Sequence, residues 1–360
     1  MFNEIINKFN LQLFAEAGTL VNATGGYVNA YTGAVEASTG MSSTLKTFYD
    51  TELLENARVE MFYAQFAKKQ PLPANHGRTV EWRRWNTFEK AGVLQEGVIP
   101  TGQKLSQISK TGSIEQYGTF AAVTDILDLH AYDDVILGAT EEMGASAAET
   151  QETLIRDALL VNTNVLYCDN ITLATGAKVG TPVAPGEMEA SDTVMSVLSP
   201  DMVSKAVTKM KKDRVPTING KYYAVIHPSV AYDLRKHDAW IEAHKYSATT
   251  EIFNGEIGEL HGVRFIENVF APILDGEYAN KEGGVTYATY FFGKDAFGII
   301  DPEGGALEMI VKDKSQAGGP LEQFSTIGYK FETNGATILY TERLLRVMSC
   351  SSFSATDEAN

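Results

Sequence analysis

The sequence predicts an α+β fold in an extended subunit, and three observations lead to this prediction. Residues 131–167 contain no proline, and their apolar side chains recur every three or four positions, as on one face of a helix. Two runs rich in β-forming residues, 78–88 and 107–124, are separated by a long connection. After residue 199, helical and strand-like segments follow one another without a regular βαβ alternation.

The composition supports a large core and disfavours several classes of function. The 360 residues are 44% hydrophobic and 21% charged, which is ordinary for a globular protein. The formal net charge of −16 disfavours direct binding of nucleic-acid phosphates, because such binding needs a basic face. Apolar runs are too short to predict a membrane span or a signal peptide. Cys168 and Cys350 are isolated, which predicts two free thiols in a reducing compartment.

Residues 1–47 are predicted to form an N-terminal arm. A short amphipathic piece, which includes Phe9, Leu13 and Phe14, leads into Gly-, Thr- and Asn-rich sequence with no periodic core face. These three side chains are candidate subunit-interface residues, and docking on the chain's own domain is the alternative. A helix is predicted over 44–69, ended by Pro71 and Pro73.

The two β-forming runs predict a projecting hairpin. The connection over 89–106 contains three glycines and a proline, and a loop of this length is uncommon inside a compact domain. Strand alternation places Trp82 and Trp85 on opposite faces, and it separates Arg83 from Arg84 in the same way. One core cannot cover both faces, so these four residues are candidate subunit-interface residues. A hairpin folded onto its own domain is the alternative.

The region 131–167 would form a helix about 55 Å long, at about 1.5 Å per residue. A second helix is predicted to begin at Ser199 as the cap, with Pro200 and Asp201 in its first turn. Basic residues between Lys205 and Arg214 complement the negative end of that helix. The remaining predictions are strands at 221–226, 262–267, 285–293 and 297–300, a helix over 228–243, an extended run over 329–348 and a polar tail over 349–360.

Candidate catalytic and metal-binding groups are sparse. His237 and His244 would lie on one helix face near Asp233, with His261 further along, but the spacing matches no compact metal motif. The paired glycines at 304–305 and 318–319 lack the setting of a phosphate-binding loop. The sequence has no G-x-S-x-G motif, and no cysteine is paired with a credible base. We therefore expect no enzyme activity, no cofactor and no metal. A metal-dependent enzyme using His237 and His244 is the minor alternative.

Several sequence blocks, taken in order, carry a family resemblance. They are PLPANHGRTVEWRRW at 71–85, LQEGVIPTGQKLS at 94–106, IEQYGTFAAVTDILDL at 114–129, YYAVIHPSVAYDLR at 222–235, GEIGELHGVRFIEN at 255–268 and GGPLEQFSTIGYK at 318–330. Together they resemble the major capsid proteins of tailed bacteriophages, and in particular the coliphage N-four-like capsid family. The similarity extends over most of residues 44–348.

The resemblance implies the Hong Kong ninety-seven capsid fold, an α+β architecture of named parts. These parts would be an N-terminal arm (1–47), a helix and connector (48–77), an extended loop (78–124), a peripheral domain with a long spine helix (125–198), an axial domain (199–299), return strands (300–348) and a C-terminal tail (349–360). A cleavable scaffolding segment and a cross-linking motif are not expected.

The function implied is that of a major capsid protein that assembles into hexamers and pentamers. These would close into an icosahedral head shell around the double-stranded DNA of a tailed phage, without sequence-specific DNA binding. The expected partners are further copies of the chain, with scaffolding, portal and decoration proteins as candidates and no membrane. The protein would be made in the host bacterial cytoplasm and reside in the virion. A prophage-derived or cellular nanocompartment shell of the same fold is the alternative.

Overall fold

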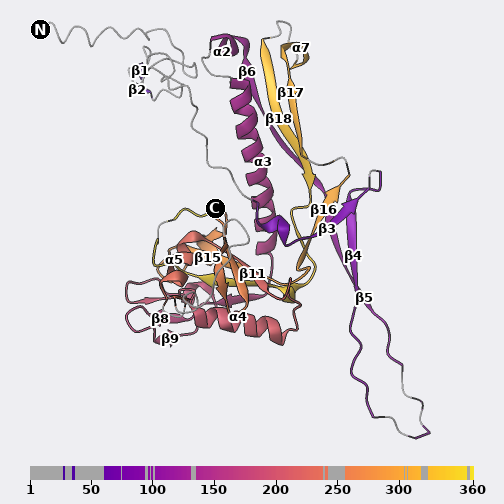
Figure 1. Ribbon diagram of the computed structural model, residues 1–360, viewed down its shortest axis with the longest axis vertical. Coiled ribbons are helices and arrows are strands. Elements are labelled where there is room, and N and C mark those ends of the chain that lie inside the picture. Colours follow the sequence, from indigo (N-terminus) through magenta and orange to yellow (C-terminus); the bar gives the residue numbers. More distant parts are fainter. Residues whose placement is uncertain are drawn as a thin grey trace, which may run out of the picture. The chain divides into compact units, whose positions relative to one another are not determined.

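The computed structural model describes residues 27–28, 35–36 and 61–360, with gaps at 74, 94–95, 98, 100–101, 131–134, 238–239, 242–255, 304, 306, 318–322 and 355–356 (Figure 1). The chain divides into two compact units. One comprises residues 1–58, 121–141 and 311–327, and the other comprises 59–120, 142–310 and 328–360. Phe9, Leu13 and Phe14 lie outside the described residues, as does the first part of the helix predicted over 44–69.

A mixed seven-stranded sheet forms the centre of the second unit, with path order β12-β13-β11-β15-β20-β7 and β14 beside β15. The strands are β7 (Val165–Tyr167), β11 (Tyr222–Ile226), β12 (Glu256–Leu260), β13 (Val263–Glu267), β14 (Ile273–Leu274), β15 (Thr286–Phe292) and β20 (Leu344–Ser349). The β11–β13 and β20–β7 pairs are parallel, and the other pairs are antiparallel. The strands predicted near 221–226, 262–267 and 285–293 are confirmed.

Both faces of this sheet are buried at its central strands β11, β15 and β20. Along β11, Tyr222, Ala224 and Ile226 belong to one apolar cluster, and Tyr223 and Val225 belong to another. The alternation follows from the two-residue period of a strand. A central strand covered on both sides reads as a continuous apolar run, which is the pattern found in this segment.

Two helices accompany the sheet, α4 (Pro200–Lys212) and α5 (Pro228–Lys236). Ser199 caps α4 as predicted, because its side chain accepts a hydrogen bond from the backbone N–H of Met202 at 3.4 Å. The helix predicted over 228–243 is not continuous. It ends at Lys236, His237 is extended, and Trp240 and Ile241 are helical again. The parallel pairing of β11 with β13 requires a crossover connection, which contains α5 and β12 and was not predicted from the sequence.

The long helix α3 spans Val135–Leu160. Its predicted continuation to residue 167 was wrong, because β7 begins at Val165. Two asparagines explain the break. The side-chain amides of Asn162 and Asn164 donate to the carbonyl oxygen of Leu344, at 2.6 Å and 3.1 Å. These bonds hold the chain beside β20, where it continues as a strand instead of a helix.

The hairpin consists of β4 (Thr79–Trp85) and β5 (Gln107–Ser113), which pair antiparallel with Trp82 opposite Lys110. The predicted second strand is in fact two strands. Buried Ile114 separates β5 from β6 (Glu115–Thr124), and β6 joins a different sheet of order β17-β18-β6. That sheet contains β17 (Glu308–Lys312) and β18 (Phe324–Thr333).

A third sheet contains β3 (Lys68–Leu72), β16 (Phe297–Pro302) and β19 (Thr337–Ile338), in the order β19-β16-β3. It overturns part of the helix predicted over 44–69, because residues 68–69 lie in a strand parallel to β16. The other elements are β1 (Tyr27–Val28), β2 (Val35–Glu36), α2 (Asp125–His130), α7 (Lys314–Ala317) and the short 3-10 turns η1 (Tyr63–Gln65), η2 (Pro185–Glu187), η3 (Gly276–Tyr278) and η4 (Thr341–Arg343).

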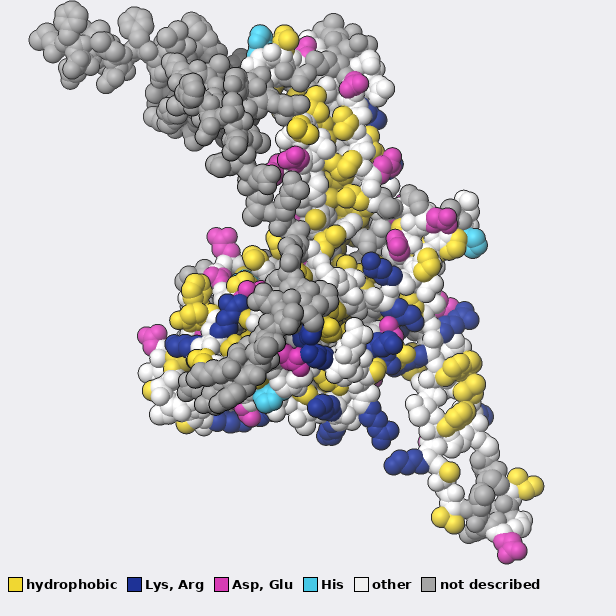
Figure 2. Space-filling view, viewed as in Figure 1, with side chains coloured by type: hydrophobic (Ala, Val, Ile, Leu, Met, Phe, Trp, Pro, Cys, Tyr) yellow, Lys and Arg dark blue, Asp and Glu magenta, His cyan; other side chains and the backbone are white. Residues whose placement is uncertain are grey.

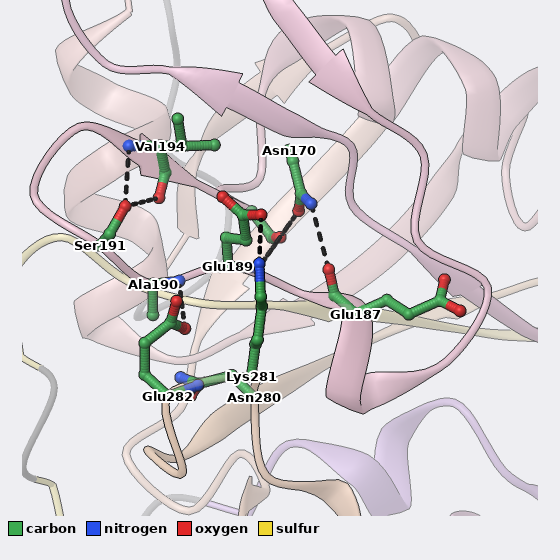
Figure 3. Close-up of polar contacts among 10 residues, drawn as sticks. Asn170, Glu187, Glu189, Ala190, Ser191, Val194, Asn280, Lys281 and Glu282 are labelled. Carbon is green, nitrogen blue, oxygen red and sulfur yellow. Dashed lines mark hydrogen bonds and ion pairs between the residues drawn. The ribbon is translucent and has the colours of Figure 1, made fainter.

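A small sheet of order β10-β8-β9 is linked to the central sheet by polar contacts (Figure 3). Its strands are β8 (Asn170–Thr172), β9 (Lys178–Gly180) and β10 (Val194–Met195). Lys281 forms an ion pair with Glu189 at 2.9 Å, and Glu282 accepts from the backbone N–H of Ala190 at 2.9 Å. The turn before β15 therefore holds the segment between β9 and β10 in place.

The described residues of the polar tail predicted over 349–360 form hydrogen bonds with other segments of the second unit. The side chain of Asp357 accepts hydrogen bonds from Tyr287 Oη at 2.7 Å and from Ser229 Oγ at 3.0 Å. Asn360 exchanges hydrogen bonds with the backbone of Ile273. Polar side chains therefore hold the described part of the tail in place. Among the described helices, none is long and apolar enough to cross a membrane.

Candidate subunit interface

The β4–β5 hairpin has one face that packs on its own unit and one face that is exposed. Burial alternates strictly along β4, with Val80, Trp82 and Arg84 half-buried and the residues between them exposed. Trp85 is 63% exposed. The predicted placement of large residues on both faces is therefore confirmed.

Trp82 lies against the third sheet of its own chain. A Cβ added to Gly298 on β16 would lie 3.0 Å from Cζ2 of this indole, and one added to Gly112 on β5 would lie 2.9 Å from Cζ3. Only glycine at these two positions leaves room for the ring. The indole N–H is buried without a hydrogen-bond partner among the described residues. Trp82 therefore anchors the hairpin base to its own chain. For this residue the structure agrees with the alternative prediction, a hairpin folded onto its own domain.

The two arginines also differ in their surroundings. The Arg84 guanidinium lies 4.8 Å from the ring centre of Tyr340, and its Nη1 is 4.0 Å from a carboxylate oxygen of Glu342. Arg83 forms an exposed ion pair with Glu81 at 2.8 Å on its own strand. This hydrogen bond is the main reason that the pKa of Glu81 lies below its usual value. Arg83 and Trp85 are thus the residues of the predicted set that face outward.

Beyond β4 and β5 the two arms of the loop remain linked. Asn86 bonds to Ser106 through both backbone and side chain, at 2.9 Å and 2.7 Å. Glu89 and Gln103 exchange two further hydrogen bonds at 2.9 Å and 3.1 Å. Past these links, Val93 is 99% exposed. A paired ribbon therefore presents apolar side chains away from its own core, as an interaction surface does.

A buried carboxylate in the middle of α3 was missed by sequence reasoning. Glu152, in the middle of α3, is fully buried. Its Oε1 accepts from the backbone N–H groups of Phe62 and Tyr63, at 3.1 Å and 3.3 Å, and from the side-chain amide of Asn268 at 2.7 Å. Burial raises the pKa of this carboxyl, although the three hydrogen bonds oppose the shift. The sequence signal was weak, because Glu152 and Arg156 are one helical turn apart, as charged pairs on exposed helix faces are, although both are buried here.

The histidines do not form a metal centre within the described residues. His244 lies outside them, and His237 is at the end of α5 instead of on its face. Asp233 accepts a hydrogen bond from the backbone N–H of Ser352 at 2.9 Å. Among the described residues, no three histidine, cysteine or carboxylate side chains lie together in a way that could hold a metal ion. His261 lies in a turn between β12 and β13.

The two thiols are free and buried. Burial raises the pKa of Cys168 well above its usual value and raises that of Cys350 to about 12. Thiols that stay protonated are poor nucleophiles and poor metal ligands. They therefore act as small apolar side chains of the core.

The sequence model of a family described as phage capsid protein matches residues 107–337, which is more than half of the chain. The chain belongs to the phage capsid protein family. It is a major capsid protein, the kind of protein that forms the head shell of a phage and resides in the virion. The matched region begins at β5 and ends in β19, so it includes α3 and most of the central sheet.

Solved capsid structures have the same fold at low sequence identity. The capsid asymmetric unit of cyanophage Pam1 is 12% identical with a TM-score of 0.66, and the match covers 89% of this chain and 100% of that one. The capsid of Ralstonia phage GP4 is 12% identical with a TM-score of 0.61, covering 90% and 100%. That of cyanophage P-SCSP1u is 13% identical with a TM-score of 0.59, covering 91% and 99%.

These likenesses confirm the predicted Hong Kong ninety-seven-like α+β fold of the phage capsid protein. No curated protein matches the sequence. The coliphage N-four-like subfamily is therefore a resemblance of sequence blocks and stays a prediction.

Proposed function

We propose that this capsid protein assembles into hexamers and pentamers that close into an icosahedral shell around double-stranded DNA. The observation that carries the proposal is the exposed face of the hairpin. Arg83, Trp85 and Val93 lie on a ribbon whose opposite face is anchored by Trp82. Exposed tryptophan and arginine are the residue types enriched where interfaces have their strongest contacts.

The proposed role is structural and non-enzymatic, in agreement with the inert thiols and the dispersed histidines. The central sheet with α4 and α5 would form the axial domain, and α3 would be the spine helix of the peripheral domain. Scaffolding, portal and decoration proteins are proposed as further partners. Synthesis would take place in the bacterial cytoplasm.

Electron microscopy of purified particles is the direct test. We expect shells of uniform size with hexamers and pentamers, and a portal vertex in particles from infected cells. Shells that contain protein cargo in place of DNA would instead favour a nanocompartment. Absence of any closed particle from the full set of head proteins would overturn the proposal.

The hairpin contact has its own test, Arg83→Ala combined with Trp85→Ala. Both side chains face outward, so the subunit should keep its melting temperature while particle yield falls. The matched control is Lys90→Ala with Lys104→Ala, which changes two other exposed loop residues. Equal particle yields from the two double variants would exclude this face of the hairpin as a subunit contact.

A further inference from the structure

Three segments of the second unit meet at Gly293, in the turn between β15 and β16. Its N–H donates to the carbonyl of Arg343 at 2.8 Å, and a Cβ there would lie 2.2 Å from Cγ1 of Val215. The N–H of Lys294 donates to the carbonyl of Pro216 at 3.0 Å. The close approach therefore joins the end of α4, the β15–β16 turn and η4.

Five basic residues, here called the basic cluster, lie within four residues in the sequence of Val215, Gly293 or Arg343, which meet at this junction. They are Lys211, Lys212, Arg214, Lys294 and Arg343. The first four are exposed and Arg343 is half-buried. Within the described residues no ion pair involves any of the five. Figure 2 shows Lys and Arg side chains gathered along the lower part of the face drawn, near the position of α4 in Figure 1.

The three segments that meet at the junction carry fewer carboxylates than cations. Asp213, Asp295 and Glu342 lie beside cluster residues in the sequence. Glu342 approaches Arg84, a sixth cation next to the cluster, at 4.0 Å. The junction therefore carries a local positive excess in a chain whose formal net charge is −16.

Arg343 is held in a fixed orientation. Its guanidinium lies 3.6 Å from the ring centre of Tyr340, and Nη1 donates to the carbonyl of Lys294 at 2.9 Å. Part of the conformational entropy that binding would cost is already lost in the free subunit. The end of α4 explains Lys211 and Lys212, because cations are favourable there. It does not explain cations contributed by two other segments.

We propose that the basic cluster docks on an acidic surface of a second copy of this chain. The inference rests on the proposed shell assembly and names one of its contacts. Identical subunits with a net charge of −16 repel one another, so a local region of opposite sign is suited to contact the acidic remainder of a neighbouring copy. DNA is the less favoured partner, because the same net charge repels a duplex.

Charge reversal tests the contact. Lys211→Glu, Lys212→Glu and Lys294→Glu are combined in one variant, and particle yield and subunit melting temperature are measured together. We expect yield to fall about tenfold or more, with unchanged melting, because like charges would now face each other. If the reversal lowers the melting temperature, the triple glutamine variant of the same positions takes its place, with a smaller fall expected.

The matched control has the same change in net charge at scattered exposed positions, Lys68→Glu, Lys236→Glu and Lys312→Glu. It should assemble better than the cluster variant. Equal yields from the two variants would overturn the proposal. Binding of a short DNA duplex by the wild-type subunit, lost in the cluster variant while assembly persists, would assign the cluster to DNA instead.

The experiment also separates failure of this contact from failure of the proposed shell assembly. If the wild-type protein forms no particles, self-association is compared by analytical ultracentrifugation. Weaker association of the cluster variant than of the scattered control then supports the contact, and equal association overturns it.

Discussion

Oε1 of Glu152 accepts a hydrogen bond from the backbone N–H of Tyr63 at 3.3 Å, which joins the middle of α3 to a segment 89 residues earlier. The same oxygen accepts hydrogen bonds from the backbone N–H of Phe62 and from the side-chain amide of Asn268. One atom therefore links three segments of the chain. Oε2 is buried without a partner among the described residues. Glu152 therefore has a structural role, because it links three segments of the chain, and its charged form is poorly solvated.

Glu152→Ala should lower the free energy of unfolding by about 2–5 kcal/mol, because it leaves buried donors without an acceptor. Glu152→Gln keeps an oxygen acceptor and should cost less. Denaturant unfolding of both variants measures the difference. Equal losses would mean that the three hydrogen bonds do not account for the effect.

The pH dependence of Glu152 has a definite sign. Its pKa in the folded subunit is raised, chiefly by burial, so folding favours the protonated form. The stabilisation is present below the unfolded-state pKa and is lost as pH rises through the higher folded-state value. The difference in unfolding free energy between wild type and Glu152→Gln should therefore shift against wild type as pH rises across that window. A pH-independent difference would contradict this assignment.

Asp357 should show the opposite sign. Burial alone would raise its pKa, but hydrogen bonds from Ser354, Tyr287 and Ser229 lower it below the usual value. Its stabilisation is present above the unfolded-state pKa and is lost as pH falls through the folded-state value. Neighbouring His227 has a pKa lowered by burial, which the Asp357 charge partly opposes. We therefore expect acid to release the last residues before the whole subunit unfolds.

Hydrogen exchange and limited proteolysis of residues 349–360 as a function of pH measure this release. Asp357→Asn should expose the segment at neutral pH. Glu358→Gln, next to it and exposed, is the control and should leave the segment protected. Equal protection of the two variants would show that the Asp357 hydrogen bonds are not what holds the segment.

The two hairpin tryptophans should separate stability from assembly. Trp82→Ala removes a ring packed against Gly298, and should lower the unfolding free energy by about 2–4 kcal/mol. Trp85→Ala removes an exposed ring and should change it by less than about 0.5 kcal/mol. Thermal melts of the isolated subunits make the comparison. A larger loss of unfolding free energy for Trp85→Ala than for Trp82→Ala would show that Trp85, and not Trp82, lies on the packed face of β4.

Gly118 on β6 should tolerate no side chain. A Cβ there would lie 2.5 Å from the carbonyl oxygen of Tyr329, which is backbone of the neighbouring strand and cannot turn aside. Gly118→Ala should therefore destabilise the subunit by about 1–3 kcal/mol. Gly144→Ala in α3 meets nothing within 4 Å and should stabilise by about 0.5–1 kcal/mol. Opposite shifts in melting temperature are the expected result.

Local chemistry determined several elements from the sequence alone. The Ser199 cap with Pro200 marks the start of α4, because both residues act through backbone groups within one turn. The two faces of β4 follow from strand alternation, and β11 follows from its unbroken apolar run. The period of the apolar side chains likewise predicted α3 within its described part.

Only the tertiary structure decided where α3 ends and how residues 68–69 fold. Leu344, far along the chain, supplies the carbonyl that Asn162 bonds, and β16 supplies the partner that makes β3 a strand. The basic cluster and the docking of Asp357 arise in the same way, since their members come from distant segments. Propensity acts through near neighbours, whereas these features depend on groups that only folding brings together.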